Sequence, residues 1–232
     1  ANFPVNSILD PGDGTCDLAE CTLREAITDA NSIGGPDTIT FNIGGGGSPQ
    51  TITLASPLPD ITETLSIDGS TQTGGACAAP PITLDGGTPG SGLSIAGPAA
   101  NGSSIRGFVI TTFGGSGIAL SGADNNQIGC NNIGGLAGNG GDGINITNSS
   151  NNVIGGAGNS NQIAFNSGNG VNVASGSGNL ISQNNIFANG GYVALGGGAN
   201  NDQAAPALTL AEYDTTNLTV TGTLTSTART IF

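Results

Sequence analysis

Acidic residues near the start of the chain are the first candidates for chemistry. Asp10, Asp13, Asp17 and Glu20 fall within residues 10–20, among glycines that permit a flexible loop. Several carboxylates on such a loop suit a hard cation such as Ca²⁺, although their spacing matches no complete EF-hand loop. The other interpretation, which the sequence favours, is a solvated acidic loop pinned by a disulfide, with no cofactor bound.

Catalytic side chains are scarce elsewhere. The chain has no His and no Lys, and Arg106 is the only base within the repeat described below. Asp124 and Asp142 occupy different positions of that repeat, so we do not expect the carboxylate pair that a glycosidase needs. Trp is absent, and Phe165 and Phe187 occupy positions typical of core stacking. The sequence therefore predicts a protein that is not an enzyme, with a polysaccharide lyase or hydrolase as an alternative.

Four cysteines and the absence of Met indicate an exported protein. Cys16 and Cys21 are close enough in sequence to close a small loop, which leaves Cys77 and Cys130 as a second pair. Three pairings are possible, and buried free thiols are the alternative for the second pair. A chain that begins at Ala1 without Met predicts the removal of a secretory signal peptide, and disulfides fit that compartment.

The charge balance excludes several partners. Sixteen acids against three bases give a formal net charge of −13. Such a surface repels phosphate backbones, so nucleic-acid binding is excluded, and anionic membrane surfaces are disfavoured. No apolar run is long enough to predict a membrane span.

A repeated phrase organises the centre of the chain. The phrase consists of glycine, an apolar residue, a small or polar residue and a second apolar residue. It occurs at Gly92–Ile95, Gly117–Leu120, Gly143–Ile146 and Gly170–Val173. The intervals between the first apolar residues are 25, 26 and 27. A period of this length is typical of a solenoid. The apolar residues Leu93, Ile118, Ile144 and Val171 should then stack in one dry column.

Two further phrases follow in the same frame. Asn126, Asn152 and Asn179 each begin an apolar-centred phrase, and a third phrase recurs at 132–133, 162–163 and 185–186. Three short strands per period predict a triangular coil. The three asparagines should stack at a turn, with their side-chain amides hydrogen-bonded from coil to coil. Residues 104–110 are expected to form one strand of this kind.

A helix is predicted at residues 22–33. Thr22 and Glu25 form a capping-box pattern, and the apolar residues Leu23, Ala26, Ile27 and Ala30 fall on one face. We expect this helix to cover the first coil, because a bare solenoid end exposes apolar side chains and open strand edges. Near the other end, residues 208–210 and 218–224 alternate as strands, with a turn at 214–217 between them.

The N-terminal part of the chain, through Gly69, resembles a known family. The matching segments are Val5–Ser7, Asp10–Cys16, Cys21–Ala26, Asp37–Phe41 and Leu65–Gly69. They resemble the domain named for its Cys-Ser-Leu-Arg-Glu-Ala motif, with Thr22 where Ser is usual. That resemblance implies a secreted, pectin-lyase-like parallel β-helix of right hand, as found in bacteria and archaea. It also implies structural roles for Arg24 and Glu25, paired within or beneath the helix.

The expected fold is therefore an all-β, right-handed parallel β-helix. Residues 1–37 should form the first strand, the disulfide loop and the capping helix, residues 38–195 the β-helix, and residues 196–232 a linker and a β appendage. We expect a non-catalytic cell-surface or matrix protein that associates with itself, end to end or by strand exchange, into filaments. The alternative is an adhesin that binds surface glycans.

Overall fold

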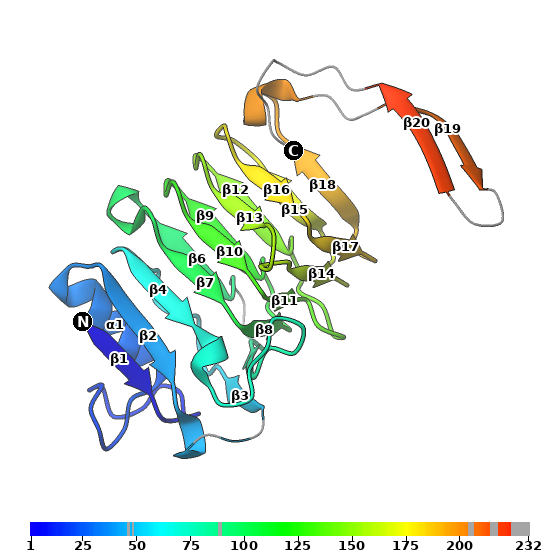
Figure 1. Ribbon diagram of the computed structural model, residues 1–232. Helices are drawn as coiled ribbons and strands as arrows, with labels where there is room; N and C mark the ends of the chain where they lie inside the picture. Colours follow the sequence, from blue (N-terminus) through cyan, green and yellow to red (C-terminus); the bar gives the residue numbers. More distant parts are fainter. Residues whose placement is uncertain (46, 48, 88–89, 204–206, 214–217, 224–232) are drawn as a thin grey trace.

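A computed structural model describes residues 1–203 except 46, 48, 88 and 89, and the two strands at 207–213 and 218–223. The chain winds into a parallel β-helix of about six turns. Figure 1 shows the turns stacked along one axis, with the N-terminus at one end and the last turn at the other. Alternating apolar and polar residues dictate this arrangement, because each strand sends every second side chain inward.

Three parallel sheets form the sides of the β-helix, and most turns contribute one strand to each. The first sheet has the order β1-β2-β4-β7-β10-β13-β16. Its strands are β1 (Asn2–Val5), β2 (Asp37–Phe41), β4 (Leu65–Asp68), β7 (Ser104–Arg106), β10 (Gln127–Gly129), β13 (Val153–Gly155) and β16 (Leu180–Ser182).

The second and third sheets follow the same rule, with orders β17-β14-β11-β8-β5-β3 and β18-β15-β12-β9-β6. The second contains β3 (Gln50–Thr53), β5 (Ile82–Asp85), β8 (Phe108–Thr111), β11 (Asn132–Ile133), β14 (Gln162–Ala164) and β17 (Asn185–Phe187). The third contains β6 (Leu93–Ala96), β9 (Ile118–Ser121), β12 (Ile144–Thr147), β15 (Asn169–Val173) and β18 (Gly191–Leu195).

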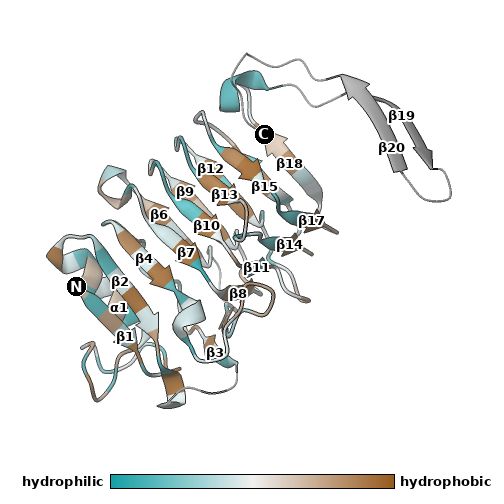
Figure 2. Ribbon diagram, in the orientation of Figure 1, coloured by the Kyte–Doolittle hydropathy of each residue, from teal (hydrophilic) through white to brown (hydrophobic). Residues whose placement is uncertain are grey.

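The predicted dry column is confirmed in the third sheet. Leu93, Ile118, Ile144 and Val171 are register partners on successive strands, and each exposes at most 1% of its surface. Hydrophobic segments recur in this way from strand to strand across the stack in Figure 2. Each turn therefore buries its apolar face only against its neighbours, which is how a solenoid is stabilised.

The prediction of one strand over residues 104–110 is wrong. The segment forms two strands, β7 in the first sheet and β8 in the second, with Gly107 between them. Gly107 has φ +82°, and a Cβ there would collide with the backbone at Gly69 and Ser70. A residue without a Cβ is what permits this sharp corner, and the apolar alternation on both sides of it concealed the change of sheet.

Helix α1 (Leu23–Ile33) covers the N-terminal end, as predicted. Thr22 is its N-cap and completes a capping box with Glu25. The apolar face of α1 contacts β1 and β2 and consists of Leu23, Ala26, Ile27 and Ala30, all buried. Short 3₁₀ turns lie at η1 (Ile43–Gly45), η2 (Gly69–Thr71), η3 (Pro98–Ala100) and η4 (Ala199–Asp202).

An antiparallel hairpin follows the last turn. It pairs β19 (Ala207–Tyr213) with β20 (Leu218–Thr223), and in Figure 1 it extends away from the β-helix. A strand pair was expected here, and the predicted turn at 214–217 lies outside the described residues. Among the described residues, no strand pairs with the outer edges of β16, β17 and β18.

Candidate functional site

Arg24 ties three segments together beneath the first loop. Its guanidinium donates to both carboxylate oxygens of Asp10, at 2.6 and 2.9 Å, and to the carbonyl oxygens of Ser56 and Pro57, each at 2.8 Å. Burial alone would raise the pKa of Asp10, but the hydrogen bonds from Arg24 and the backbone prevail and lower it. Arg24 thus has the structural role that was expected, with Asp10 as its partner.

Glu25 organises the N-terminus of α1 and the loop above it. Its Oε2 accepts the Thr22 N–H at 2.8 Å and the Thr22 hydroxyl at 2.9 Å, and its Oε1 accepts the Gly14 N–H at 2.5 Å. Burial would raise the pKa of Glu25, but these bonds to the carboxylate lower it. Glu25 is therefore held ionised as a cap, which leaves it unsuited to act as a catalytic acid.

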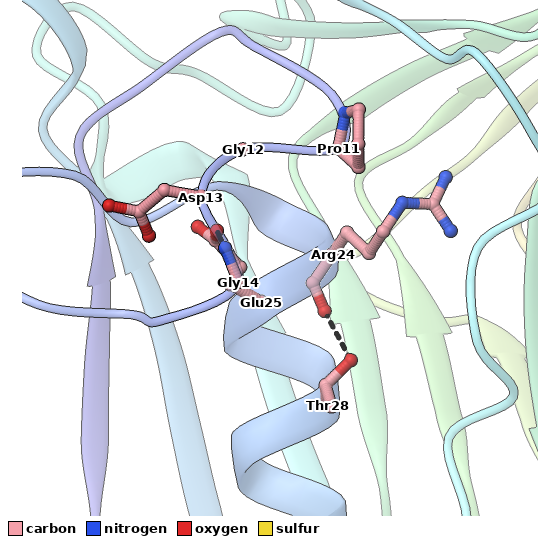
Figure 3. A pocket seen from close by; sticks show the side chains of 7 residues that line it. All are labelled: Pro11, Gly12, Asp13, Gly14, Arg24, Glu25 and Thr28. Carbon is pink, nitrogen blue, oxygen red and sulfur yellow. Dashed lines mark hydrogen bonds between the residues drawn. The ribbon is translucent and has the colours of Figure 1, made fainter.

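An open hollow of about 280 Å³ lies between this loop and α1. It is lined by Pro11, Gly12, Asp13, Gly14, Arg24, Glu25 and Thr28. In Figure 3 the guanidinium of Arg24 lies to one side of the loop and the carboxylate of Glu25 lies beneath it. Because both charged groups are already bonded within the protein, the hollow offers no free base next to a free acid from these two residues.

The structure brings together only part of the predicted calcium site. Carboxylate oxygens of Asp13, Glu20 and Glu25 lie within 4.8 Å of one another. Asp10 instead pairs with Arg24, and Asp17 closes a turn by accepting the Ala19 N–H at 2.6 Å. Sequence reasoning missed Glu25 in this group because its capping pattern explained its presence.

The oxygens of this carboxylate group are largely occupied. Glu20 accepts the Ser7 hydroxyl at 3.1 Å and the Asp13 N–H at 3.2 Å, and Asp13 accepts the Thr15 N–H at 3.0 Å. Ca²⁺ takes six to eight oxygen ligands. Each of these acids therefore has a hydrogen-bond partner in the loop that it helps to close.

Both cysteine pairs form disulfides. Cys16 is joined to Cys21 in the N-terminal loop, and Cys77 is joined to Cys130, 53 residues later. The first closes the acidic loop against the start of α1. The second fastens the irregular segment before β5 to the corner that follows β10, so it connects parts of the chain on different turns.

The stack predicted for Asn126, Asn152 and Asn179 is present. The backbone N–H and the side-chain amide of Asn126 both donate to Oδ1 of Asn152, at 2.8 and 3.0 Å, and Asn152 donates likewise to Asn179. Asn200 of η4 extends the column by accepting from Asn179. Asn126 and Asn152 are fully buried, so this ladder replaces the hydrogen bonds that water would make.

Two more asparagine ladders were missed by the sequence reasoning. They also join side-chain amides from turn to turn, at the other two corners, and consist of Asn131, Asn161 and Asn184, and of Asn139, Asn166 and Asn189. Their members are 30, 27 or 23 residues apart, because the intervening loops differ in length. The first of these ladders has a signal in the sequence, which is an asparagine directly before each of the strand segments 132–133, 162–163 and 185–186.

The acids of the central turns serve the same stacking. Asp124 accepts the Ser150 N–H at 2.7 Å, and Asp142 accepts the Asn169 N–H at 2.7 Å. Each bond joins one turn to the next. Arg106 lies 3.8 Å from Asp68 on the neighbouring strand of the first sheet. These contacts give the central charged residues structural partners.

Phe165 and Phe187 stack on each other, but outside the core, which corrects the expectation. Their rings meet edge to face with centroids 5.7 Å apart, and Phe165 exposes 41% of its surface. Phe165 has φ +64° directly after β14, where the chain leaves the strand. The turn conformation, which spacing alone does not reveal, directs this side chain outward.

The last turn exposes positions that are buried everywhere before it. Val171 and Val173 are fully buried, whereas their register partners Val193 and Leu195 expose 46% and 37%. Tyr192 exposes 70%. Among the described residues, η4 covers one corner of this end, where Ala199 is buried. The apolar interior therefore reaches the surface at this end, in contrast to the end beneath α1.

Comparison with known proteins identifies one family. The family model described as a right-handed β-helix region matches residues 86–221, more than half of the chain. A search among curated proteins gave no match. The helices in the described part of the chain are too short or too polar to cross a bilayer.

Proposed function

The chain belongs to the right-handed β-helix family, and from this premise we propose that it is a non-catalytic structural module of a cell surface or extracellular matrix that associates with copies of itself. The observation that carries the proposal is the exposure of Val193 and Leu195 at inward positions of the last turn. Open sheet edges beside exposed apolar residues favour association with another chain.

An extracellular location fits the covalent chemistry. Two disulfides are typical of a chain that folds in an oxidising compartment. The resemblance of Cys21–Ala26 to the motif of exported β-helix proteins supports the same location and the finer family assignment. Secretion is therefore part of the proposal.

A non-catalytic role fits the use of the ionisable groups. Glu25 and Asp10 have lowered pKa values and internal partners, and Asp124 and Asp142 bond successive turns. The proposed role needs no cofactor, and Ca²⁺ is not required for it. Helix α1 covers the N-terminal end, so a filament of turns stacked head to tail would require α1 to move. Strand exchange through the hairpin of β19 and β20 would leave α1 in place.

The test combines mass and activity. Sedimentation velocity and electron microscopy of the purified chain should show association that increases with concentration. Incubation with pectin and alginate should release neither reducing sugar nor unsaturated product. A monomer that cleaves either polymer would overturn the proposal in favour of an enzyme. A monomer that binds a glycan array would favour the adhesin.

A further inference from the structure

The three edge strands of the last turn form a surface that no described segment pairs. We name this surface the open end and define it as β16, β17 and β18. Its apolar residues include Ile181 and Ile186, which are half-buried, and Tyr192, Val193 and Leu195, which are exposed. In the preceding turn the partners of Ile181 and Ile186 are Ile154 and Ile163, both fully buried. A further layer of chain would bury the open end in the same way.

The asparagine ladders also reach this surface. In the turn before, the N–H groups of Asn161 and Asn166 donate to Asn184 and Asn189. Asn184 and Asn189 are the last members of their ladders within the described residues. The open end therefore combines apolar side chains with the last described asparagines of two ladders.

Charge is absent from the turns that lead to the open end. Thirteen of the 16 acids lie in residues 1–142, whereas residues 143–201 contain no Asp, Glu, Lys or Arg. Two copies with a net charge of −13 each repel one another over most of their surfaces. The first acid after these turns is Asp202 of η4. The charge-free turns are where two copies approach with least repulsion.

The cap at the other end decides which surface the second copy presents. The first turn is covered by α1, whose apolar side chains are buried against β1 and β2. The apolar residues that remain exposed near this end lie outside its strands, in the N-terminal loop and at the end of α1: Ile8, Leu9, Leu18 and Ile33. The surface with open edges and matching apolar content is the open end itself, and a surface that contacts its own copy forms a two-fold interface.

We propose, building on the self-associating role above, that two copies join through their open ends into a closed two-fold pair. Under this symmetry the edge strands of one copy meet those of the other in antiparallel orientation. The pair places the two α1 caps at its distant ends. Association through this contact stops at two copies, because each copy uses its one open end.

The test compares three substitutions that add the same charge at different places. Val193→Glu lies on the open end, Ser121→Glu lies on the exposed side of β9, and Thr28→Glu lies on the exposed face of α1. Sedimentation velocity over a concentration series gives the dimer dissociation constant for each. We expect wild type, Ser121→Glu and Thr28→Glu to form dimers alike, and Val193→Glu to dissociate at least about tenfold more readily.

The possible outcomes separate this interface from the broader proposal. If wild type associates but Val193→Glu does so equally well, the open-end interface is wrong and self-association stands. If Thr28→Glu weakens association, the contact is head to tail and the open-end pair is wrong. If mass grows beyond two copies, the contact is head to tail or by strand exchange, and the closed pair is again wrong. If wild type stays monomeric at every concentration, self-association fails together with the interface. Circular dichroism and urea unfolding of Val193→Glu exclude loss of folding as the cause.

Discussion

Asn126 donates both its backbone N–H and its side-chain amide to a single oxygen, Oδ1 of Asn152, 26 residues later in the chain. The two residues are fully buried at the same corner of neighbouring turns. A side chain thus substitutes for a backbone partner where the chain bends away from its sheet. The stability of each corner therefore depends on an amide that hydrophobic residues of similar size cannot replace.

Asn152→Leu should be strongly destabilising. It removes the acceptor for two Asn126 donors and the donor to Asn179, so buried polar groups lose their partners. We expect a loss of about 2–4 kcal/mol in the free energy of unfolding, measured by urea denaturation. Asn145→Leu is the control, because Asn145 forms an outward-facing pair with Asn172 and should cost under about 1 kcal/mol. Equal costs would contradict a special role for the buried ladder.

Arg24 and Asp10 should be energetically coupled. Arg24→Lys keeps the charge but loses the paired bonds to Asp10, so we expect a loss of about 1–3 kcal/mol in the free energy of unfolding. A double-mutant cycle with Arg24→Ala and Asp10→Ala should give a coupling energy of about 1–2 kcal/mol. Additive effects would show that Arg24 acts mainly through the Ser56 and Pro57 carbonyl oxygens.

Stability should depend on the ionisation of Glu25. The pKa of Glu25 in the folded chain lies below its ordinary value of 4.5. Its ionised form thus adds stability that is fully present above about pH 4.5 and is lost as pH falls through the folded pKa. The difference in unfolding free energy between wild type and Glu25→Gln should be constant from about pH 7 to 5 and shrink below that range. Asp60→Asn, at an exposed carboxylate, serves as the control.

The two disulfides should contribute unequally. Cys77–Cys130 closes a much longer loop than Cys16–Cys21, with separations of 53 and 5 residues. Replacing the long-range pair with serines should cost about 4 kcal/mol, against about 2 kcal/mol for the short one, if constraint of the unfolded chain dominates. Urea unfolding of the two double-serine variants measures both values. A larger cost for the short pair would mean that its main effect is on the folded loop beside α1.

The sequence allowed the fold to be predicted because its strongest signal is periodic. Regular spacing identified the column from Leu93 to Val171 and one asparagine ladder, and the capping pattern identified α1. The Asn131 ladder was missed although the strands that follow its members were recognised at the same intervals of 30 and 23 residues, because the asparagine before each strand was not taken as a buried, stacked position. The corner at Gly107 and the outward turn at Phe165 depend on single backbone angles, which apolar spacing does not encode.

The candidate sites were less predictable for a different reason. Acidic residues near one another in sequence suggested a common ligand, but the fold assigns Asp10 to Arg24 and Asp17 to a turn. Which carboxylates share a loop is visible in the sequence. Which backbone N–H groups occupy their oxygens depends on how the loop closes against α1, and only the folded chain reveals it.

The unequal loops between ladder asparagines imply that the fold tolerates inserted residues in these loops, which engineers could use. Asn131 and Asn161 are 30 residues apart and Asn161 and Asn184 are 23 apart, yet the hydrogen bonds between their side-chain amides have similar lengths of 3.2 and 2.9 Å. The corner therefore fixes where a connecting segment leaves and returns, and leaves its length free. Foreign peptides grafted between Gly155 and Asn159 should accordingly be displayed from a rigid frame, with the anchoring column undisturbed.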